Sequence, residues 1–387
     1  MSTKLKEKIF NESVKNIPFI DLKLQQNKIR IKIDQAIKRV LDHGKYIMGP
    51  EVFELEEKLA EFSKVKNVVT CSSGTDALLM VLMAKGIGPG DAVFLPSFTY
   101  TATPEVVAIL GATPIFVDVF SDTYNIDHNN LQQSIFIAKK NDLEPKAIIA
   151  VDLFGQPSDY NALEHVANKN NLWILSDAAQ SFGGEFFKRR VGSLGHATAT
   201  SFFPAKPLGC YGDGGAVFTD DDELADIVRS IRLHGKGEHK YDNVRIGLNA
   251  RLDTIQAAIL IEKMQLFDEE LKERQDVTSY YNKMLKHIVQ VPYVINDTSS
   301  AWAQYTIQVP NINIREVLIN NLKAKGIPSM IYYEKPLHLQ TAYKHFPKSN
   351  SLKVSEDISK KVLSLPISLK HSSYIVEKFC EVYKNAF

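Results

Sequence analysis

Hydrophobic residues follow two patterns that alternate along most of the chain. Short apolar runs recur between longer segments in which apolar residues are spaced three or four positions apart. Continuous runs are typical of parallel strands buried on both faces, and the spaced pattern is typical of amphipathic helices. The runs predict strands at residues 67–73, 92–96, 113–120, 146–155, 172–183, 197–203 and 216–220.

The amphipathic segments predict the helices that separate these strands. In residues 50–64, for example, we expect Phe53, Leu55, Leu59 and Phe62 to face inward. Comparable spacing predicts helices at residues 29–44, 76–86, 159–171, 221–235 and 247–275, and a loop and helix at 97–111.

The pattern changes after about residue 291. Predicted strands at 303–310 and 328–333 now alternate with predicted helices at 315–326 and 373–387. A change from regular strand–helix alternation to a shorter mixed pattern is typical of a second, smaller domain.

We therefore expect an α/β fold with two domains. Residues 17–265 would form a large domain around a mostly parallel sheet flanked by helices, and residues 266–387 a smaller C-terminal α+β domain. Residues 1–16 are polar and are expected to be an N-terminal extension.

Composition narrows the possible functions. Of 387 residues, 44% are hydrophobic and 24% charged, and the formal net charge is +1. That balance gives no electrostatic case for binding nucleic acid or an anionic membrane. No apolar run approaches the roughly 18 residues of a membrane-spanning helix, and the N-terminus lacks the apolar core of a signal peptide. Cys71, Cys210 and Cys380 match neither a disulfide framework nor a zinc site, so we expect a cytoplasmic protein without a bound metal.

Lys206 is the first candidate for chemistry. It lies in the segment SFFPAKPLGCYGDGG, residues 201–215, between a predicted strand and a glycine-rich turn. Pro204 and Pro207 flank it, and because proline fixes φ and disfavours helix before it, a short rigid loop is expected. In this apolar setting the amine can be desolvated and neutral, fit to act as a nucleophile, a Schiff-base partner or a proton shuttle. An exposed turn lysine is the alternative.

Three further features are expected near the same edge of the sheet, where ligands bind in parallel α/β folds. Asp177 ends a predicted strand, Gly74 and Thr75 join a strand to a helix whose N-terminus favours phosphate, and residues 97–100 form a loop containing an aromatic residue. Separately, a helix cap or a solvated turn explains each one. Together with Lys206 they meet the needs of pyridoxal 5′-phosphate, which requires a lysine, a carboxylate at its ring nitrogen, a phosphate site and a stacked ring.

Several motifs accompany the lysine segment: FIDL, GKYIMGPEV, SSGTDAL, PSFTYTAT, SDAAQSFG, RLHG and GLNARLDTIQAA. With them the sequence resembles the DegT/DnrJ/StrS sugar-nucleotide aminotransferases from about Phe19 to the C-terminus. The resemblance implies the aspartate aminotransferase fold (fold type I), with a seven-stranded sheet and pyridoxal 5′-phosphate. Within that family the sequence is most similar to the UDP-2-acetamido-2-deoxy-3-oxo-glucuronate aminotransferases of surface-polysaccharide (O-antigen or capsule) synthesis.

The resemblance also implies roles for individual residues. Lys206 would be the Schiff-base lysine and catalytic acid/base, and Asp177 would pair with the pyridinium nitrogen. The other implied cofactor contacts are Gly74, Thr75 and Ser201 to the phosphate, Tyr100 stacked on the ring, Gln180 at the ring hydroxyl and Asn249 at the cofactor of the partner subunit. The implied substrate contacts are Arg251, Tyr333 and His338.

The implied reaction is amino transfer from L-glutamate to a UDP-linked 3-oxo sugar, in a homodimer with active sites at the subunit interface. Tyr332 stands where the resemblance leads us to expect a histidine near the sugar C6 group, so a 3-oxo or 4-oxo 6-deoxy sugar on UDP or dTDP stays an alternative. A pyridoxal-phosphate-dependent sugar dehydratase is a weaker alternative, because those that remove a 3-hydroxyl carry histidine in place of Lys206. A regulator without turnover would need a DNA-binding segment, and none is evident in the sequence.

Overall fold

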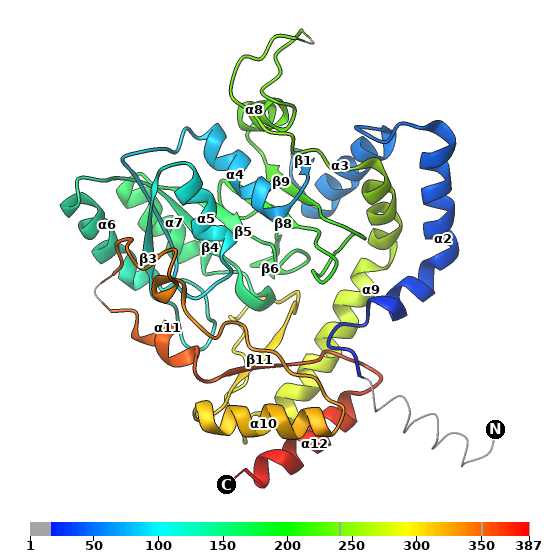
Figure 1. Cartoon of the computed structure of the whole chain (residues 1–387), viewed down its shortest axis with the longest axis vertical. Coiled ribbons are helices and arrows are strands. Elements are labelled where there is room, and N and C mark those ends of the chain that lie inside the picture. The colour runs from blue at the N-terminus through cyan, green and yellow to red at the C-terminus, as the bar shows by residue number, and fades with distance from the viewer. Residues whose placement is uncertain (1–16, 240, 350, 387) are drawn as a thin grey trace.

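The structure is a computed structural model that describes residues 17–239, 241–349 and 351–386, so the expected extension 1–16 lies outside the described residues. A seven-stranded sheet forms the centre of the large domain (Figure 1). In spatial order its strands are β1 (Asn67–Cys71), β9 (Gly215–Thr219), β8 (Ala197–Ser201), β5 (Trp173–Asp177), β4 (Glu144–Val151), β2 (Asp91–Pro96) and β3 (Thr113–Val117). All neighbours pair in parallel except β9, which is antiparallel to both β1 and β8. This confirms the expected α/β fold with a mostly parallel sheet.

Helices cover both faces of this sheet. The helices of the described chain are α2 (Leu22–His43), α3 (Pro50–Ser63), α4 (Gly74–Ala84), α5 (Ala102–Ile109), α6 (Leu131–Lys140), α7 (Tyr160–Asn170), α8 (Asp222–Arg232), α9 (Thr254–Leu285), α10 (Ile312–Ala324), α11 (Lys353–Ile358) and α12 (Ser372–Lys384). Three short 3₁₀ turns complete them: His128–Asn130, Leu153–Gly155 and Leu337–Leu339.

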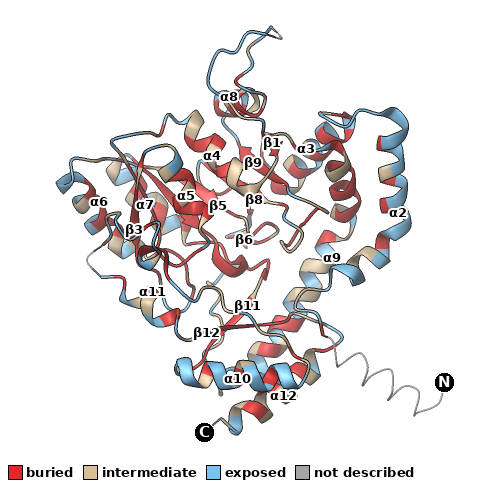
Figure 2. Cartoon of the chain, viewed as in Figure 1, coloured by how far each residue is buried: buried red, intermediate tan, exposed pale blue. Residues whose placement is uncertain are grey.

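Alternate residues of the central strands enter two different cores. In β2, Val93 and Leu95 pack with α4, α5 and α8, whereas Ala92 and Phe94 pack with α6 and α7. All four side chains are fully buried, and Figure 2 shows the sheet as a buried layer between partly exposed helices. Burial on both faces explains why these strands are read as continuous apolar runs rather than as alternating ones.

A smaller unit follows the sheet domain along the chain. Strand β11 (Tyr305–Gln308) pairs antiparallel with β12 (Val362–Leu365), and α10 and α12 share a buried apolar cluster with them. Short two-residue strands, β6 (Glu185–Phe186), β7 (Arg189–Arg190) and β10 (Thr298–Ser299), form a third small sheet.

Helix α9 belongs to both units. Near its start, Leu260 and Phe267 pack with α3 in a cluster of the large domain, while Tyr281 and Leu285 pack with β11, β12 and α12. The predicted domain boundary between residues 265 and 266 falls inside this helix, and the division stays a prediction.

Some expectations about secondary structure and burial are wrong. Residues 247–253 are not helical, because α9 begins only at Thr254. Residues 328–333 form no strand; Met330 makes only an isolated bridge to Ser364, and β12 takes the place beside β11. Phe53 is 49% exposed, because Val52, Leu55 and Leu59 already fill the buried side of α3. No helix in the described part of the chain has the length and apolar character needed to cross a bilayer.

Candidate active site

Asp177 lies where β5 ends, at the carboxyl edge of the parallel strands. Its carboxylate accepts hydrogen bonds from the Thr103 hydroxyl (2.9 Å) and the Ala179 N–H (3.3 Å). The residue is only 6% exposed, and burial raises the pKa of its carboxyl group, while these two donors and the Lys206 amine lower it. A carboxylate held this way is suited to face a positive charge in a dry site.

Lys206 lies on a compact loop close enough to Asp177 for their charges to interact. The loop is closed by hydrogen bonds from the Lys206 N–H to the Phe203 carbonyl (2.8 Å) and from the Cys210 N–H to the Phe202 carbonyl (2.7 Å). Burial lowers the pKa of the Lys206 amine, and attraction to Asp177 only partly opposes that shift. The amine is therefore easier to deprotonate than that of an exposed lysine.

Gly74, the first residue of α4, approaches the end of β8 closely. A Cβ atom on Gly74 would lie 2.7 Å from the Ser201 Cβ, nearer than real side chains come. Ser73 precedes the helix as its N-cap, and its hydroxyl accepts the Asp76 N–H at 3.0 Å. The free N–H groups at Gly74 and Thr75 thus lie beside Ser201, an arrangement that favours a phosphate. The donor set and the close approach fit the phosphate of pyridoxal 5′-phosphate.

Gln180, Tyr333 and Tyr100 form a connected group next to Asp177. The Gln180 Oε1 accepts the Phe154 N–H at 2.8 Å, and its Nε2 donates to the Tyr333 hydroxyl at 3.3 Å. The rings of Tyr333 and Tyr100 lie 6.4 Å apart at 40°. Burial raises the pKa of Tyr333, so its hydroxyl stays protonated, whereas Tyr100 is 56% exposed and presents a free aromatic surface. The structure therefore brings together an amine, a carboxylate, an anion site and an aromatic ring. They come from the Lys206 loop, the end of β5, the start of α4 and the loop after β2.

Asn249 and Arg251 lie farther along, between α8 and α9. Asn249 is exposed and forms an isolated β-bridge with Leu233, just after α8. The loop between these two residues projects beyond α8 (Figure 1). Arg251 follows Ala250, whose carbonyl accepts the Ser72 N–H at 3.2 Å beside the α4 N-terminus. Among the described residues no hydrogen bond or ion pair involves the Arg251 side chain, so its guanidinium is available to a ligand.

His338 is built into the fold. Its Nδ1 is hydrogen-bonded to the Ser97 hydroxyl at 2.5 Å, and its Nε2 to Glu356 at 3.1 Å. The residue is 2% exposed, and burial lowers its pKa, which Glu356 partly offsets. Because both ring nitrogens are engaged, His338 links the loop after β2 to α11, and the structure leaves it no free nitrogen for a substrate.

Two supporting residues were not among the predicted site residues. Thr103 holds Asp177, and the backbone of Phe154 orients Gln180. The motif PSFTYTAT, which contains Thr103, was a signal for the first. Nothing in the sequence around Phe154 indicates the second.

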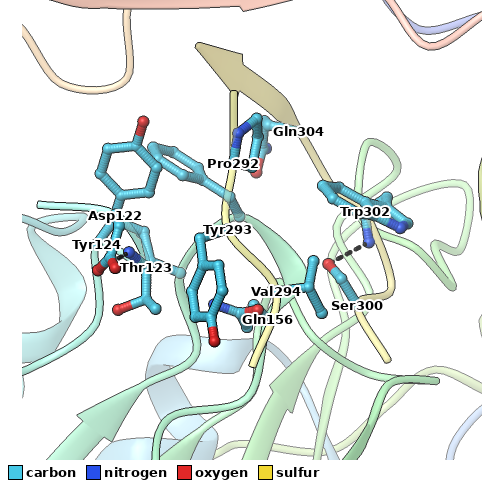
Figure 3. A pocket seen from close by; sticks show the side chains of 12 residues that line it. Asp122, Thr123, Tyr124, Gln156, Pro292, Tyr293, Val294, Ser300, Trp302 and Gln304 are labelled. Atoms are coloured by element: carbon cyan, nitrogen blue, oxygen red, sulfur yellow. Dashed lines mark hydrogen bonds between the residues drawn. The ribbon is translucent and has the colours of Figure 1, made fainter. Parts of the chain in front are cut away.

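Two cavities differ in what they can hold. Figure 3 shows a small one of about 20 Å³, between the turn after β4 and residues 292–304, where the buried Gln304 Oε1 has no hydrogen-bond partner among the described residues. It has room for about one water molecule. A larger cavity of about 410 Å³ is lined by Lys206, residues 19–28, α9 and residues 365–370, and it is of a size that takes a small-molecule substrate. Among the described residues no cluster of His, Cys, Asp and Glu is arranged to hold a metal ion.

Known proteins resemble the chain over nearly its whole length. The model of the DegT/DnrJ/EryC1/StrS aminotransferase family matches residues 27–382. The UDP-2-acetamido-2-deoxy-3-oxo-D-glucuronate aminotransferase of Pseudomonas aeruginosa is 45% identical over 95% of this chain and 100% of its own length. The pleiotropic regulatory protein of Geobacillus stearothermophilus is 37% identical over 96% of this chain and 99% of its own length.

Solved structures agree in fold and name the cofactor. A DegT/DnrJ/EryC1/StrS aminotransferase from Brucella abortus has a TM-score of 0.92 at 51% identity, covering 96% of this chain and 99% of its own. NtdA from Bacillus subtilis, solved with bound PMP, has a TM-score of 0.86 at 27% identity, covering 96% of this chain and 86% of its own. The motif resemblance, the fold and the cofactor expected from the sequence are thereby confirmed. This chain belongs to the DegT/DnrJ/EryC1/StrS aminotransferase family and is a pyridoxal-phosphate-dependent enzyme.

Proposed function

We propose that this enzyme transfers an amino group from L-glutamate to C3 of UDP-2-acetamido-2-deoxy-3-oxo-D-glucuronate, in the cytoplasm, for surface-polysaccharide synthesis. The observation that carries the chemistry is the desolvated Lys206 amine beside Asp177 and the Gly74 helix start. Similarity to the Pseudomonas aeruginosa enzyme, which is named for that sugar, supports the substrate.

Each residue has a defined task in this proposal. The bound cofactor supplies an electron sink for breaking a C–H bond at the reacting carbon. Lys206 Nζ, more easily neutral than an exposed amine, would accept that proton and, once protonated, would act as the acid that returns it. Asp177, held by Thr103, would balance the positive charge of the cofactor's ring nitrogen. One base serving both halves of the reaction predicts ping-pong kinetics.

The other candidate site residues would bind and orient the cofactor and the substrate. Gly74, Thr75 and Ser201 would hold the phosphate, Tyr100 would stack on the ring, and Gln180 would contact its hydroxyl while Phe154 fixes the amide. For the substrate we retain Arg251 and Tyr333. His338, with both nitrogens engaged, supports the site without touching the sugar.

We also propose a homodimer in which Asn249 reaches the partner's cofactor. Asn249 is exposed in the single chain, and so are Val244 and Ile246 on the same loop, at 54% and 85%. Exposed apolar side chains beside an exposed polar one are typical of a surface that another chain covers.

Product analysis tests the proposed reaction. The cofactor-loaded enzyme is mixed with glutamate and the UDP-linked 3-oxo uronate, and 2-oxoglutarate and the aminated sugar are quantified. We expect equal amounts of both, none with Lys206→Ala, and full activity with the control Lys58→Ala, since Lys58 is an exposed lysine of α3. Equal turnover by Lys206→Ala contradicts the chemistry. Preference for a 4-oxo 6-deoxy sugar would move the substrate to the alternative, and sugar turnover without 2-oxoglutarate would indicate a dehydratase.

A further inference from the structure

The cavity that opens at Lys206 has a positive lining with one unusual member. Lys28, Lys206, Lys263, Arg274 and Lys370 face three acids, Asp21, Glu270 and Glu273. Each acid already has a partner in the protein, as described below. Because five cations face three acids, the cavity is an environment that favours an anion.

The acids of the lining are occupied. Asp21 accepts the Leu24 N–H at 2.9 Å as the N-cap of α2. Glu273 pairs with Lys28 at 3.0 Å. The two oxygens of Glu270 accept the Gln25 amide at 2.8 and 2.7 Å.

Arg274 is a partly buried cation of this lining with few partners. A guanidinium carries five N–H donors. The one described hydrogen bond of this side chain runs from Nη1 to the Trp302 carbonyl, at 3.1 Å. Glu270 lies one helical turn earlier on α9, and the two charges attract, but they form no ion pair within the described part of the chain. Burial lowers the pKa of Arg274, and attraction to Glu270 opposes that shift only in part, so the guanidinium lies in a site that disfavours its charge.

Lys263 has a different task in the same cavity. Its Nζ donates to the Gly209 carbonyl, in the loop that carries Lys206, and lies 5.2 Å from the centre of the Tyr211 ring. Lys263 is thereby engaged in holding the loop. Lys370 has no side-chain hydrogen bond or ion pair among the described residues either, but it is exposed to solvent. Arg274 is therefore the partly buried cation of this lining that keeps N–H donors for a bound molecule.

We propose that Arg274 binds the carboxylate of a substrate whose reacting end lies at Lys206. This inference rests on the proposed function, which requires two substrates to use one site in turn. An arginine fork binds a carboxylate through two parallel hydrogen bonds, the geometry that its unpaired N–H groups leave open. Glutamate and the uronate sugar both carry a carboxylate, and the experiment distinguishes them.

Direct binding is measured first, without turnover. Glutarate, an unreactive dicarboxylate, is titrated calorimetrically into the cofactor-loaded enzyme and into Arg274→Gln. We expect the variant to bind glutarate about ten- to a hundredfold more weakly, the loss typical of a charge-assisted pair. Equal binding by both proteins, or none by either, overturns the proposal. This result does not depend on which sugar the enzyme uses, so failure of the proposed function is detected separately.

Kinetics then identify the source of the carboxylate. The KM for glutamate is compared with that for the UDP-linked 3-oxo uronate and for its analogue with a hydroxymethyl group at C6. If Arg274→Gln raises the KM for glutamate alone, Arg274 binds the amino donor. If the variant raises the KM for the uronate alone, Arg274 binds the sugar, and if it raises both KM values, Arg274 binds each substrate in turn. Unchanged KM values for all three overturn the proposal.

Two further variants guard against misfolding and nonspecific effects. Glu270→Gln keeps the shape and an acceptor for Gln25 but removes the negative charge near Arg274, so we expect tighter glutarate binding at pH 8, by a few fold. Weaker or unchanged binding contradicts the electrostatic argument. Arg229→Gln is the matched control, because Arg229 pairs with Asp226 at 2.9 Å on α8 and does not line the cavity. Loss of glutarate binding in that control would overturn the assignment to Arg274.

Discussion

The close approach of Gly74 to Ser201 makes one substitution especially informative. In Gly74→Ala the new Cβ would lie 2.7 Å from the Ser201 Cβ, whereas carbon atoms ordinarily pack at about 3.5–4 Å. Either the start of α4 or the end of β8 must therefore move by about 1 Å. Overpacking of this kind costs about 1–3 kcal/mol.

That cost should appear in cofactor binding, because the same two segments form the phosphate site. If the whole cost of about 1–3 kcal/mol weakens the phosphate contacts, the dissociation constant of pyridoxal 5′-phosphate rises about 5- to 150-fold, at 1.4 kcal/mol per factor of ten. The assay removes the cofactor by dialysis against an amino donor and then titrates pyridoxal 5′-phosphate back, following its absorbance, while chemical unfolding measures the stability of the apoprotein.

A nearby glycine supplies the control. Gly88 has no positive φ, and a Cβ there would meet nothing closer than the Leu110 carbonyl at 4.0 Å. Gly88→Ala should bind the cofactor as the unchanged protein does. The reasoning is refuted if Gly74→Ala binds with unaltered affinity, or if it only loses stability, because the close approach would then serve packing and not the phosphate.

Other predictions follow from the contacts around the site. Asp177→Asn should retain the cofactor but release 2-oxoglutarate at least tenfold more slowly, because an amide cannot balance the ring-nitrogen charge; an unchanged rate would remove Asp177 from its role. Burial lowers the pKa of Lys263 from 10.5 to about 8. Below pH 8 the amine is protonated in both the folded and the unfolded chain, so folding bears the full cost of burying its charge. As the pH rises from 7 to 10 the folded chain loses this proton first, so the free energy of unfolding, relative to that of Lys263→Met, should rise by about 2–3 kcal/mol. Urea unfolding measures this difference, and a flat or falling difference contradicts the prediction. His338→Gln should lower the free energy of unfolding by about 1–3 kcal/mol without changing either KM, whereas a selective rise in the sugar KM would restore His338 as a substrate contact. Mixing inactive Lys206→Ala and Asn249→Ala subunits should restore about a quarter of the activity if each site combines both chains, and no recovery after confirmed subunit exchange would argue against a shared site.

Local sequence was enough to place the strands of the central sheet and the two candidate residues Asp177 and Lys206. Continuous apolar runs identified β2 and β4 because both of their faces are buried. Asp177 was recognisable as the last residue of a buried strand, and Lys206 because two prolines and a glycine-rich turn surround it. The errors arose where contacts between residues far apart in the sequence decide the secondary structure. Residues 328–333 are apolar enough for a strand, but residues 362–365 occupy the position beside β11.

Partners of individual side chains were equally inaccessible from sequence. The engagement of His338 depends on Ser97 and on Glu356, which come from separate parts of the chain. Phe53 has the spacing of a buried residue, yet α3 has no room for it on its inner side. Spacing along a helix defines its faces, but only the packed neighbours decide how wide the buried face is.

Helix α9 limits how the two units can move. Its 32 residues form one uninterrupted helix about 48 Å long, with one end packed on α3 and the other on α12. If the C-terminal unit rotates toward the sheet, α9 must bend, or its side chains must separate from α3 or from α12. Both changes cost energy. Arg274 lies on the stretch between the two anchored ends. Bending of α9 there would change the distance from Arg274 to Lys206, and with it the width of the cavity that both residues line.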